Sequence, residues 1–212
     1  MVLSPDPIAA GLVESLAHPG GNVTGLSLMS VDISGKRLAL LKEAVPKISR
    51  VTLMVDPKDP SSKLVVASSL AAAKDLGLEL RIAEVTSPAT IDAALAEAVA
   101  AGSEALISGA GPLMFNERAR IGSFVSAKRL PTEVSVAEML PFGPLLSYGQ
   151  DFPDYFRRAI TYVDRILKGA KPADLPVEQP SRFKLTLNMR TAKSLGLEFP
   201  ASLLAGADEI LD

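Results

Sequence analysis

Short apolar, β-branched runs alternate with helical patterns along most of this chain, and this alternation most constrains its fold. The candidate strands are Asn22–Ser27, Arg50–Val55, Leu78–Val85, Glu104–Ser108, Leu130–Val134 and Pro144–Tyr148. The first five begin about 25 to 28 residues apart, which is the length of one strand–helix unit. The run Val51–Val55 is nearly all apolar, as expected of a strand that is covered on both faces. The pattern predicts an α/β domain with a parallel sheet and helices on both of its faces.

Helix signals lie between these strands. Three segments begin at a residue suited to capping and end at a glycine: Ser61–Gly77, Ser87–Gly102 and Asp151–Gly169. The last segment is long and amphipathic, and its apolar face includes Phe152, Phe156 and Ile160. Three basic residues on one side of an earlier helix are expected to face solvent: Lys36, Arg37 and Lys42.

Composition excludes several function classes. The chain has 212 residues, 48% of them hydrophobic, and its net charge of −2 does not favour nucleic acid or anionic lipid. The absence of cysteine excludes disulfides and thiolate chemistry, and a single histidine, His18, argues against zinc sites and Ser-His-Asp triads. The glycine-rich run Gly109–Pro112 lacks the later glycine of a dinucleotide-binding loop. We therefore expect a binding protein with no catalytic residues, no metal and no cofactor.

Small and polar residues follow the predicted strands, at the edge where doubly wound sheets bind ligands. Their hydroxyl, carboxylate and backbone N–H groups can bind the ammonium and carboxylate of a small zwitterion. The expected ligand-binding residues are Ser27, Asp56, Ser61, Ser108, Gly109, Tyr148 and Asp151. Turn formation or helix capping is the alternative role, above all for Asp151, and a structural role is favoured for the neighbouring Asp59.

The last third of the chain predicts a crossing between two lobes. The segment Gly169–Pro180 contains three prolines and three charges, so it cannot be a regular helix or a central strand. The alternating segment Arg182–Asn188 is typical of a half-covered or edge strand, and Thr191–Leu195 and Pro200–Leu211 are expected to be short helices. Pairing of Arg182–Asn188 into the sheet of Val51–Val55 would contradict this interpretation and leave no gap for a ligand.

Several runs together resemble the ABC-transporter substrate-binding family whose better-known members bind aromatic amino acids. They are His18–Ser27, Ser34–Leu38, Leu41–Pro46, Phe115–Ile121, Ser147–Gly149, Asp164–Pro180 and Thr191–Leu197. The resemblance covers nearly the whole chain. It implies the type I periplasmic-binding-protein fold, in which two flavodoxin-like, doubly wound lobes close around a small ligand. It also implies delivery of that ligand to a membrane permease with a cytoplasmic ATPase.

The resemblance further implies an N-terminally truncated chain, because family members carry an export signal and most of a first lobe ahead of Ser4. The expected parts are 1–20 as a remnant of the first lobe, 21–150 as the complete second lobe, 151–180 as crossing helix and hinge, and 181–212 as the return to the first lobe. The full-length form would be periplasmic or lipid-anchored outside the cytoplasm. An orphaned Arg182–Asn188 strand predicts a homodimer or segment exchange.

The sequence departs from the family pattern at the positions that are expected to determine ligand specificity. Asp56-Pro57 replaces a common Asn-Pro, Leu106–Pro112 replaces a more polar loop, and Leu130–Leu140 lacks the usual Tyr and Phe. The resemblance therefore does not carry aromatic amino-acid specificity over. Two alternatives remain open: the effector-binding core of a transcriptional regulator, which would need an upstream helix-turn-helix, and a doubly wound enzyme domain.

Overall fold

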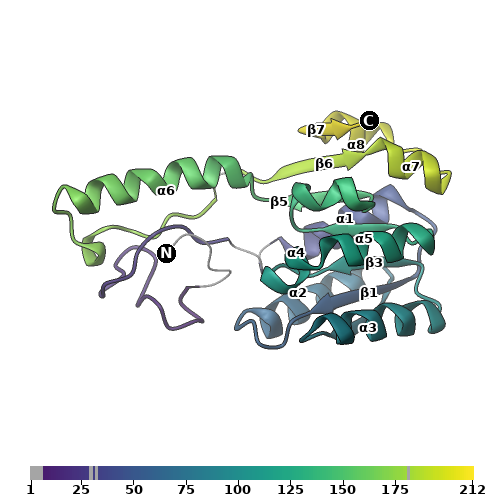
Figure 1. Ribbon diagram of the computed structural model, residues 1–212, viewed down its shortest axis with the longest axis horizontal. Coiled ribbons are helices and arrows are strands. Elements are labelled where there is room, and N and C mark those ends of the chain that lie inside the picture. The colour runs from purple at the N-terminus through teal and green to yellow at the C-terminus, as the bar shows by residue number, and fades with distance from the viewer. Residues whose placement is uncertain (1–6, 29–30, 32, 181) are drawn as a thin grey trace.

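The computed structural model describes residues 7–28, 31, 33–180 and 182–212. Figure 1 shows an α/β body and an outlying part, in which one long helix extends away from the body. The strands are β1 (Arg50–Val55), β2 (Glu79–Glu84), β3 (Ala105–Ser108), β4 (Thr132–Val134), β5 (Leu146–Gly149), β6 (Lys184–Asn188) and β7 (Glu209–Leu211). The helices of the body are α1 (Ser34–Ala44), α2 (Ser62–Asp75), α3 (Pro88–Ala100), α4 (Pro112–Asn116), α5 (Arg118–Ala127), the 3-10 turn η1 (Ala137–Phe142), α7 (Met189–Leu195) and α8 (Ala201–Gly206). The outlying part contains α6 (Phe152–Leu167) and the 3-10 turn η2 (Pro172–Asp174).

The strands of the body form one sheet. Within the described residues its order is β2-β1-β3-β4-β5-β6-β7, and β1 to β5 all run parallel. The order 2-1-3-4-5 is that of flavodoxin-like doubly wound sheets. The predicted α/β class and parallel sheet are therefore confirmed, and five of the six strands predicted from the apolar runs lie in it.

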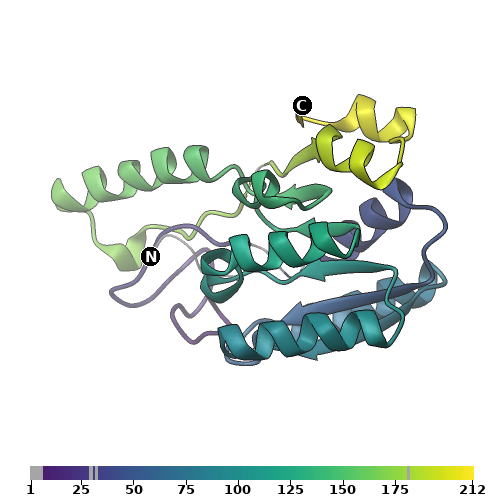
Figure 2. The same ribbon diagram turned by 45° about the vertical axis from the view of Figure 1, so that its right-hand side comes forward.

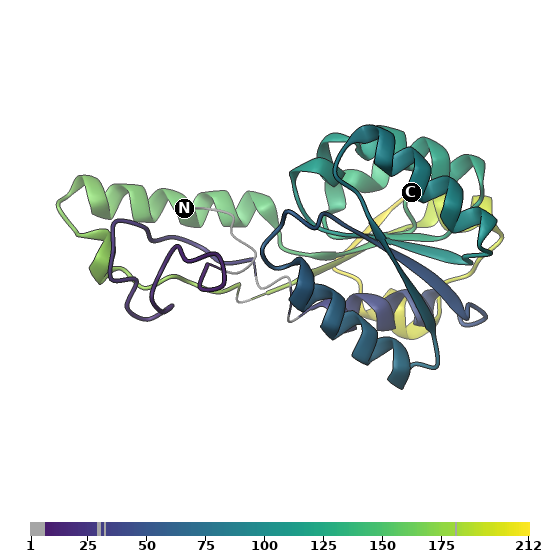
Figure 3. The same ribbon diagram turned by 90° about the horizontal axis from the view of Figure 1, so that it is seen from below.

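Helices cover both faces of this sheet (Figure 3). Alternation along β1 explains why, because Leu53 packs into one buried cluster and Met54 into another. The first cluster includes Leu38 of α1 and Leu203 of α8, and the second includes Ile91 of α3. A strand buried on both faces is expected to be mostly apolar, and Val51–Val55 has one polar residue, Thr52, whose hydroxyl is hydrogen-bonded to that of Ser103.

The strand predicted at Arg182–Asn188 exists as β6, but its predicted place in another body is wrong. It pairs antiparallel with β5, in the sheet that contains β1, and β7 pairs with its other edge. An alternating pattern of apolar and polar residues is compatible with a strand in either lobe, so the pattern alone does not predict which sheet the strand joins. Because β6 has partners on both sides, the reason given for a homodimer through it disappears, and the dimer stays an untested prediction. The strand β7 also replaces the end of the helix expected over Pro200–Leu211.

The strand predicted at Asn22–Ser27 is not part of the sheet. Leu26 instead forms an isolated bridge with Glu178, and residues 7–28 run beside α6 (Figure 2). Thr24 Oγ1 donates to the Leu175 carbonyl at 2.5 Å. This outlying part has its own small apolar cluster of Leu26, Leu28, Tyr155, Tyr162 and Leu175. The residues that we assigned to the start of the second lobe, 21–28, therefore lie with α6 instead.

One face of α6 is apolar and exposed. Phe156, Ile160, Val163 and Leu167 recur at helical spacing and are 52%, 65%, 55% and 82% exposed. The helix was predicted from this same apolar face, but the exposure of that face to solvent was not predicted. A continuous exposed stripe of this kind is typical of a contact surface.

Acid sensitivity is expected at the edge of the sheet where β1 and β3 begin. Glu104 Oε2 accepts from the backbone N–H groups of Ser49 at 2.6 Å and Arg50 at 3.0 Å, and these bonds lower the pKa of Glu104 to about 2. A carboxyl with a depressed pKa stabilises the fold above its unfolded value of 4.5, and this contribution is lost as the pH falls toward 2. The urea midpoint of Glu104→Gln should therefore fall less between pH 5 and pH 2.5 than that of the wild type. Equal slopes would contradict the role, and Glu84→Gln is the exposed control.

Candidate ligand-binding cavity

A cavity of about 670 Å³ opens at the carboxyl ends of the parallel strands. Its volume lies in the range of small-molecule sites, roughly 300–1,000 Å³. It is next to β1 and β3, where the strand order reverses and doubly wound sheets bind ligands. The walls come from Asp56 and Lys58 after β1, residues 110–116 after β3, Ser135 and Met139 after β4, Gln150 after β5, and Phe152 and Phe156 of α6.

Aromatic side chains form the apolar side of the cavity. The ring centroids of Phe152 and Phe156 are 6.4 Å apart on successive turns of α6. Phe115 lines the cavity from the body, and the guanidinium of Arg118 lies 4.6 Å from its ring centroid, within the range of a cation–π contact. Because α6 belongs to the outlying part and Phe115 to the body, a molecule in the cavity would contact both parts.

The loop after β1 separates two predicted ligand residues. Asp56 lines the cavity, and one of its carboxylate oxygens accepts from the Lys58 backbone N–H at 2.9 Å. Ser61 is buried and lies outside the cavity lining; its hydroxyl donates to Asp59 Oδ1 at 2.8 Å. The Asp59 carboxylate also accepts from the Ser61 backbone N–H, which confirms its structural role in the helix entry. The Ser61 side chain does not cap α2.

Ser108 and Gly109 hold β3 against its neighbours beneath the cavity. Ser108 is fully buried, and its carbonyl accepts from Arg37 Nη2 at 2.7 Å. A Cβ on Gly109 would lie 2.5 Å from the Met54 carbonyl oxygen, so the close approach of β1 requires glycine there. Neither residue lines the cavity, and both have structural roles that account for their presence.

The other three predicted residues are dispersed. Ser27 is buried in the outlying part, and its backbone N–H donates to the Glu178 carbonyl at 2.9 Å. The Tyr148 ring packs on Phe183, with centroids 5.7 Å apart. Asp151 caps α6 by accepting a backbone N–H of its first turn at 3.1 Å, which is the alternative role expected for it. Of the seven predicted residues, Asp56 alone lines the larger cavity.

A buried ion pair beneath the cavity was missed by sequence reasoning. Arg37 and Glu133 are both buried, Arg37 Nε donates to Glu133 Oε1 at 2.9 Å, and Nη2 lies 2.6 Å from Oε2. The prediction that Arg37 faces solvent is therefore wrong. The signal was Glu133 itself, because a carboxylate inside an apolar strand must find a partner.

Burial also changes the acidity of Glu133. Removal from water raises its pKa to about 7, against the opposing effects of Arg37 and of the Tyr148 backbone N–H. A carboxyl of unusually high proton affinity therefore lies beneath the cavity, in contact with the lining residue Arg37. Arg37 itself lines the cavity, and its guanidinium is already paired with the Glu133 carboxylate.

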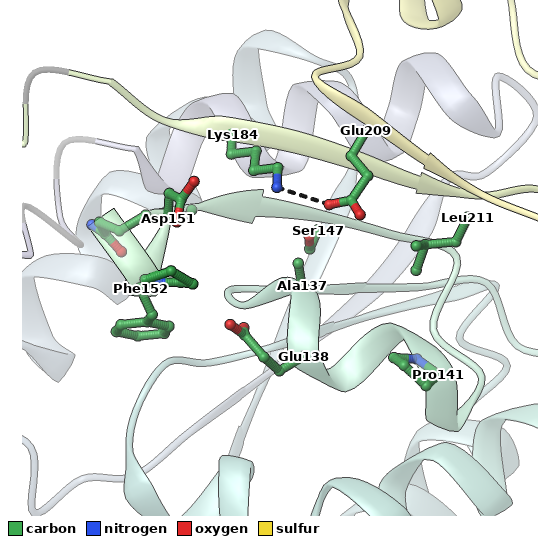
Figure 4. Close-up of a pocket in the computed structure, with 12 residues that line it drawn as sticks. Ala137, Glu138, Pro141, Ser147, Asp151, Phe152, Lys184, Glu209 and Leu211 are labelled. Carbon is green, nitrogen blue, oxygen red and sulfur yellow. Dashed lines mark ion pairs between the residues drawn. The ribbon is translucent and has the colours of Figure 1, made fainter. Parts of the chain in front are cut away.

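A smaller cavity of about 280 Å³ shares Glu138, Gln150 and Phe152 with the larger one. Figure 4 shows it between η1, the start of α6 and the strands β6 and β7. Lys184 and Glu209 form an ion pair of 2.8 Å on its upper side. The Glu138 carboxylate and the Phe152 ring lie across from one another on its lower side (Figure 4).

The described residues lack two kinds of feature. They hold no group of three or more His, Cys, Asp or Glu side chains that could bind a metal ion. In the same part of the chain, no helix has the length and apolar character needed to cross a membrane.

Comparison with known proteins identifies the family. Residues 1–211 match the family model described as ABC transporter substrate binding protein. The chain belongs to the ABC transporter substrate-binding protein family. Substrate-binding proteins of this family are binding proteins rather than enzymes, and they act outside the cytoplasm with a small-molecule ligand and a permease partner. Membership confirms the resemblance seen in the sequence, and it favours neither the regulator nor the enzyme alternative.

Individual relatives agree with this membership. A curated tyrosine-binding protein of Clostridioides difficile (strain R20291) is 26% identical over 194 residues, which are 91% of this chain and 55% of that protein. The structure of an ABC domain in complex with L-Trp from Streptococcus pneumoniae is 28% identical, with a TM-score of 0.90 over 100% of this chain and 72% of that one. A ligand-free, open substrate-binding protein with adhesive properties from Clostridium difficile shares the fold, with 24% identity, 99% and 70% coverage and a TM-score of 0.69. The chain spans about half the length of the curated tyrosine-binding protein that it matches.

Proposed function

We propose that this chain captures a small solute, an amino acid or a similar molecule, in the 670 Å³ cavity and presents it to an ABC permease. The observation that carries the proposal is the position of this cavity, at the carboxyl ends of the strands and against the aromatic wall of α6. The family match supports it, as do relatives whose names record tyrosine and L-Trp. The full-length protein would be periplasmic or lipid-anchored.

Capture would depend on relative motion of two parts of the chain. We assign the sheet body to one lobe, and residues 7–28 with α6 and the Gly169–Pro180 return to the other. A ligand favours the closed arrangement only as far as it contacts both, and Phe156 and Phe115 supply contacts from opposite parts. The connector would then act as a hinge, with the lobes moving as rigid bodies.

Isothermal calorimetry of the chain against a panel of amino acids and small carboxylates tests the proposal. We expect at least one ligand, and we expect Ala110→Phe, which fills the cavity beside Phe115, to weaken its binding at least about 10-fold, equivalent to ~1.4 kcal/mol. The matched control is Ala96→Phe, on the exposed side of α3, which should bind as the wild type does. No binding across the panel, or equal weakening in both variants, would count against this site.

A further inference from the structure

The residues shared by the two cavities offer hydrogen-bond acceptors without partners. Gln150 is only 9% exposed, and its Nε2 donates to the Leu28 carbonyl, which leaves its Oε1 as an acceptor. Glu138 lines the same two cavities; its side chain is exposed and, among the described residues, makes no hydrogen bond or ion pair. The Glu138 carboxylate and the Phe152 ring both lie on the lower side of the smaller cavity, with the carboxylate directed toward the ring (Figure 4). A carboxylate, an amide oxygen and the face of an aromatic ring all attract a cation.

The cations around the cavities are mostly matched already. Arg37 forms an ion pair with Glu133, and Lys184 forms one with Glu209. Two cations near the larger cavity have no carboxylate partner among the described residues: Lys58, which is exposed in the loop after β1, and Arg118, which lies over the Phe115 ring and donates to the Phe115 carbonyl. The larger cavity is also lined by three carboxylates, which belong to Asp56, Asp59 and Glu138. These three carboxylates would repel a ligand carboxylate and attract a ligand ammonium, and of the three Glu138 accepts no hydrogen bond from the described residues.

The geometry points to selection of an ammonium group on an apolar body, with no requirement for a carboxylate. The ammonium would donate to the Glu138 carboxylate and to Gln150 Oε1 beside the Phe152 ring. The apolar body would lie against Phe156 and Phe115 in the larger cavity. This inference rests on the proposed function, and it narrows the solute to amines and to amino-acid derivatives whose carboxylate is absent or neutral.

Three compounds with one indole-ethyl body separate the charges: tryptamine carries the ammonium alone, L-tryptophan carries both groups, and indole-3-propionate carries the carboxylate alone. Calorimetry should find tryptamine bound at least about 10-fold more tightly than L-tryptophan, because both compounds can donate the ammonium hydrogen bond but only L-tryptophan brings a carboxylate to the carboxylates of the cavity. Indole-3-propionate should bind most weakly of the three.

The variant Glu138→Gln tests the assigned acceptor. It should weaken tryptamine about 10-fold while leaving indole-3-propionate unchanged or tighter. The matched control is Glu97→Gln on α3, an exposed glutamate outside both cavities, which should leave all three affinities unchanged. Thermal unfolding of both variants shows whether the fold is kept.

The possible results separate this inference from the proposed function. L-tryptophan or indole-3-propionate binding at least as tightly as tryptamine overturns the ammonium preference while the cavity remains a binding site. Equal effects of Glu138→Gln and Glu97→Gln on tryptamine binding also overturn it. The same holds if a solute of the amino-acid and carboxylate panel binds while none of the three indole compounds does. Failure of every solute overturns both.

Discussion

Replacing Glu133 with leucine is expected to lower the free energy of unfolding by about 3–5 kcal/mol. The substitution leaves the Arg37 guanidinium buried without its carboxylate, and a guanidinium cannot lose its proton to escape the cost. Urea unfolding followed by circular dichroism at pH 7 measures the change. A loss below about 1 kcal/mol, the value typical of exposed pairs, would show that the buried pair is not required.

Removing the other partner should have a smaller, pH-dependent effect. In Arg37→Met the unpaired Glu133 can take up a proton, because burial already holds its pKa near 7 in the intact pair. A carboxyl whose folded pKa is raised above the unfolded 4.5 gives its full stability below that value and loses it as the pH rises through the folded value. The variant should therefore approach wild-type stability near pH 4.5 and fall behind toward pH 8. The exposed Arg120→Met, whose partners are Asp92 and Glu117, is the control for removal of a surface cation.

Replacing Gly149 with alanine should be the second severe change. A Cβ at this position would lie 1.9 Å from the Ser135 carbonyl oxygen, and a backbone carbonyl cannot rotate away as a side chain can. Overpacking typically costs ~1–3 kcal/mol, and we expect the upper end, about 3 kcal/mol, because the ends of β4 and β5 must separate. The urea midpoint gives the stability, and loss of calorimetric binding would report damage to the adjoining cavities.

The matched control for this glycine lies in α8. Gly206→Ala meets no heavy atom within 4 Å of the added Cβ, so it should be neutral or stabilise the helix by about 0.5–1 kcal/mol. If both alanine variants unfolded at the same urea concentration, the close approach of Ser135 to β5 would not constrain the fold.

The layered body could be predicted because its signals are local. The apolar run of β1 and the capping residues around α3 and α6 each specify structure within a few neighbouring residues, and all three elements form where expected. The place of β6 could not be predicted in the same way. Alternating side chains fit an edge in either part of the molecule, and the choice depends on contacts with β5 that its own sequence does not encode.

The site was harder to predict than the fold. A cavity opens at the sheet edge that the strand ends indicated, but polarity there does not distinguish a ligand residue from a helix cap or a buried hydrogen-bonded residue, as Asp151 and Ser108 illustrate. The ion pair of Arg37 and Glu133 joins residues 96 positions apart, so neither sequence neighbourhood contains it. The aromatic wall was visible as the apolar face of a helix, but the cavity beside it required the tertiary arrangement.

The expectation that a strand pairing into the main sheet would leave no room for a ligand was also wrong. The chain leaves after β5, runs out along α6 and returns to β6, and Gly149 and Lys184 stand opposite each other in the antiparallel pairing. Topologically, α6 and its return are an excursion inserted at the tip of a β-hairpin. The departure and return therefore share one narrow base, which the pairing of β5 with β6 holds together, and the chain joins this excursion to α1 by a separate connection after residue 28.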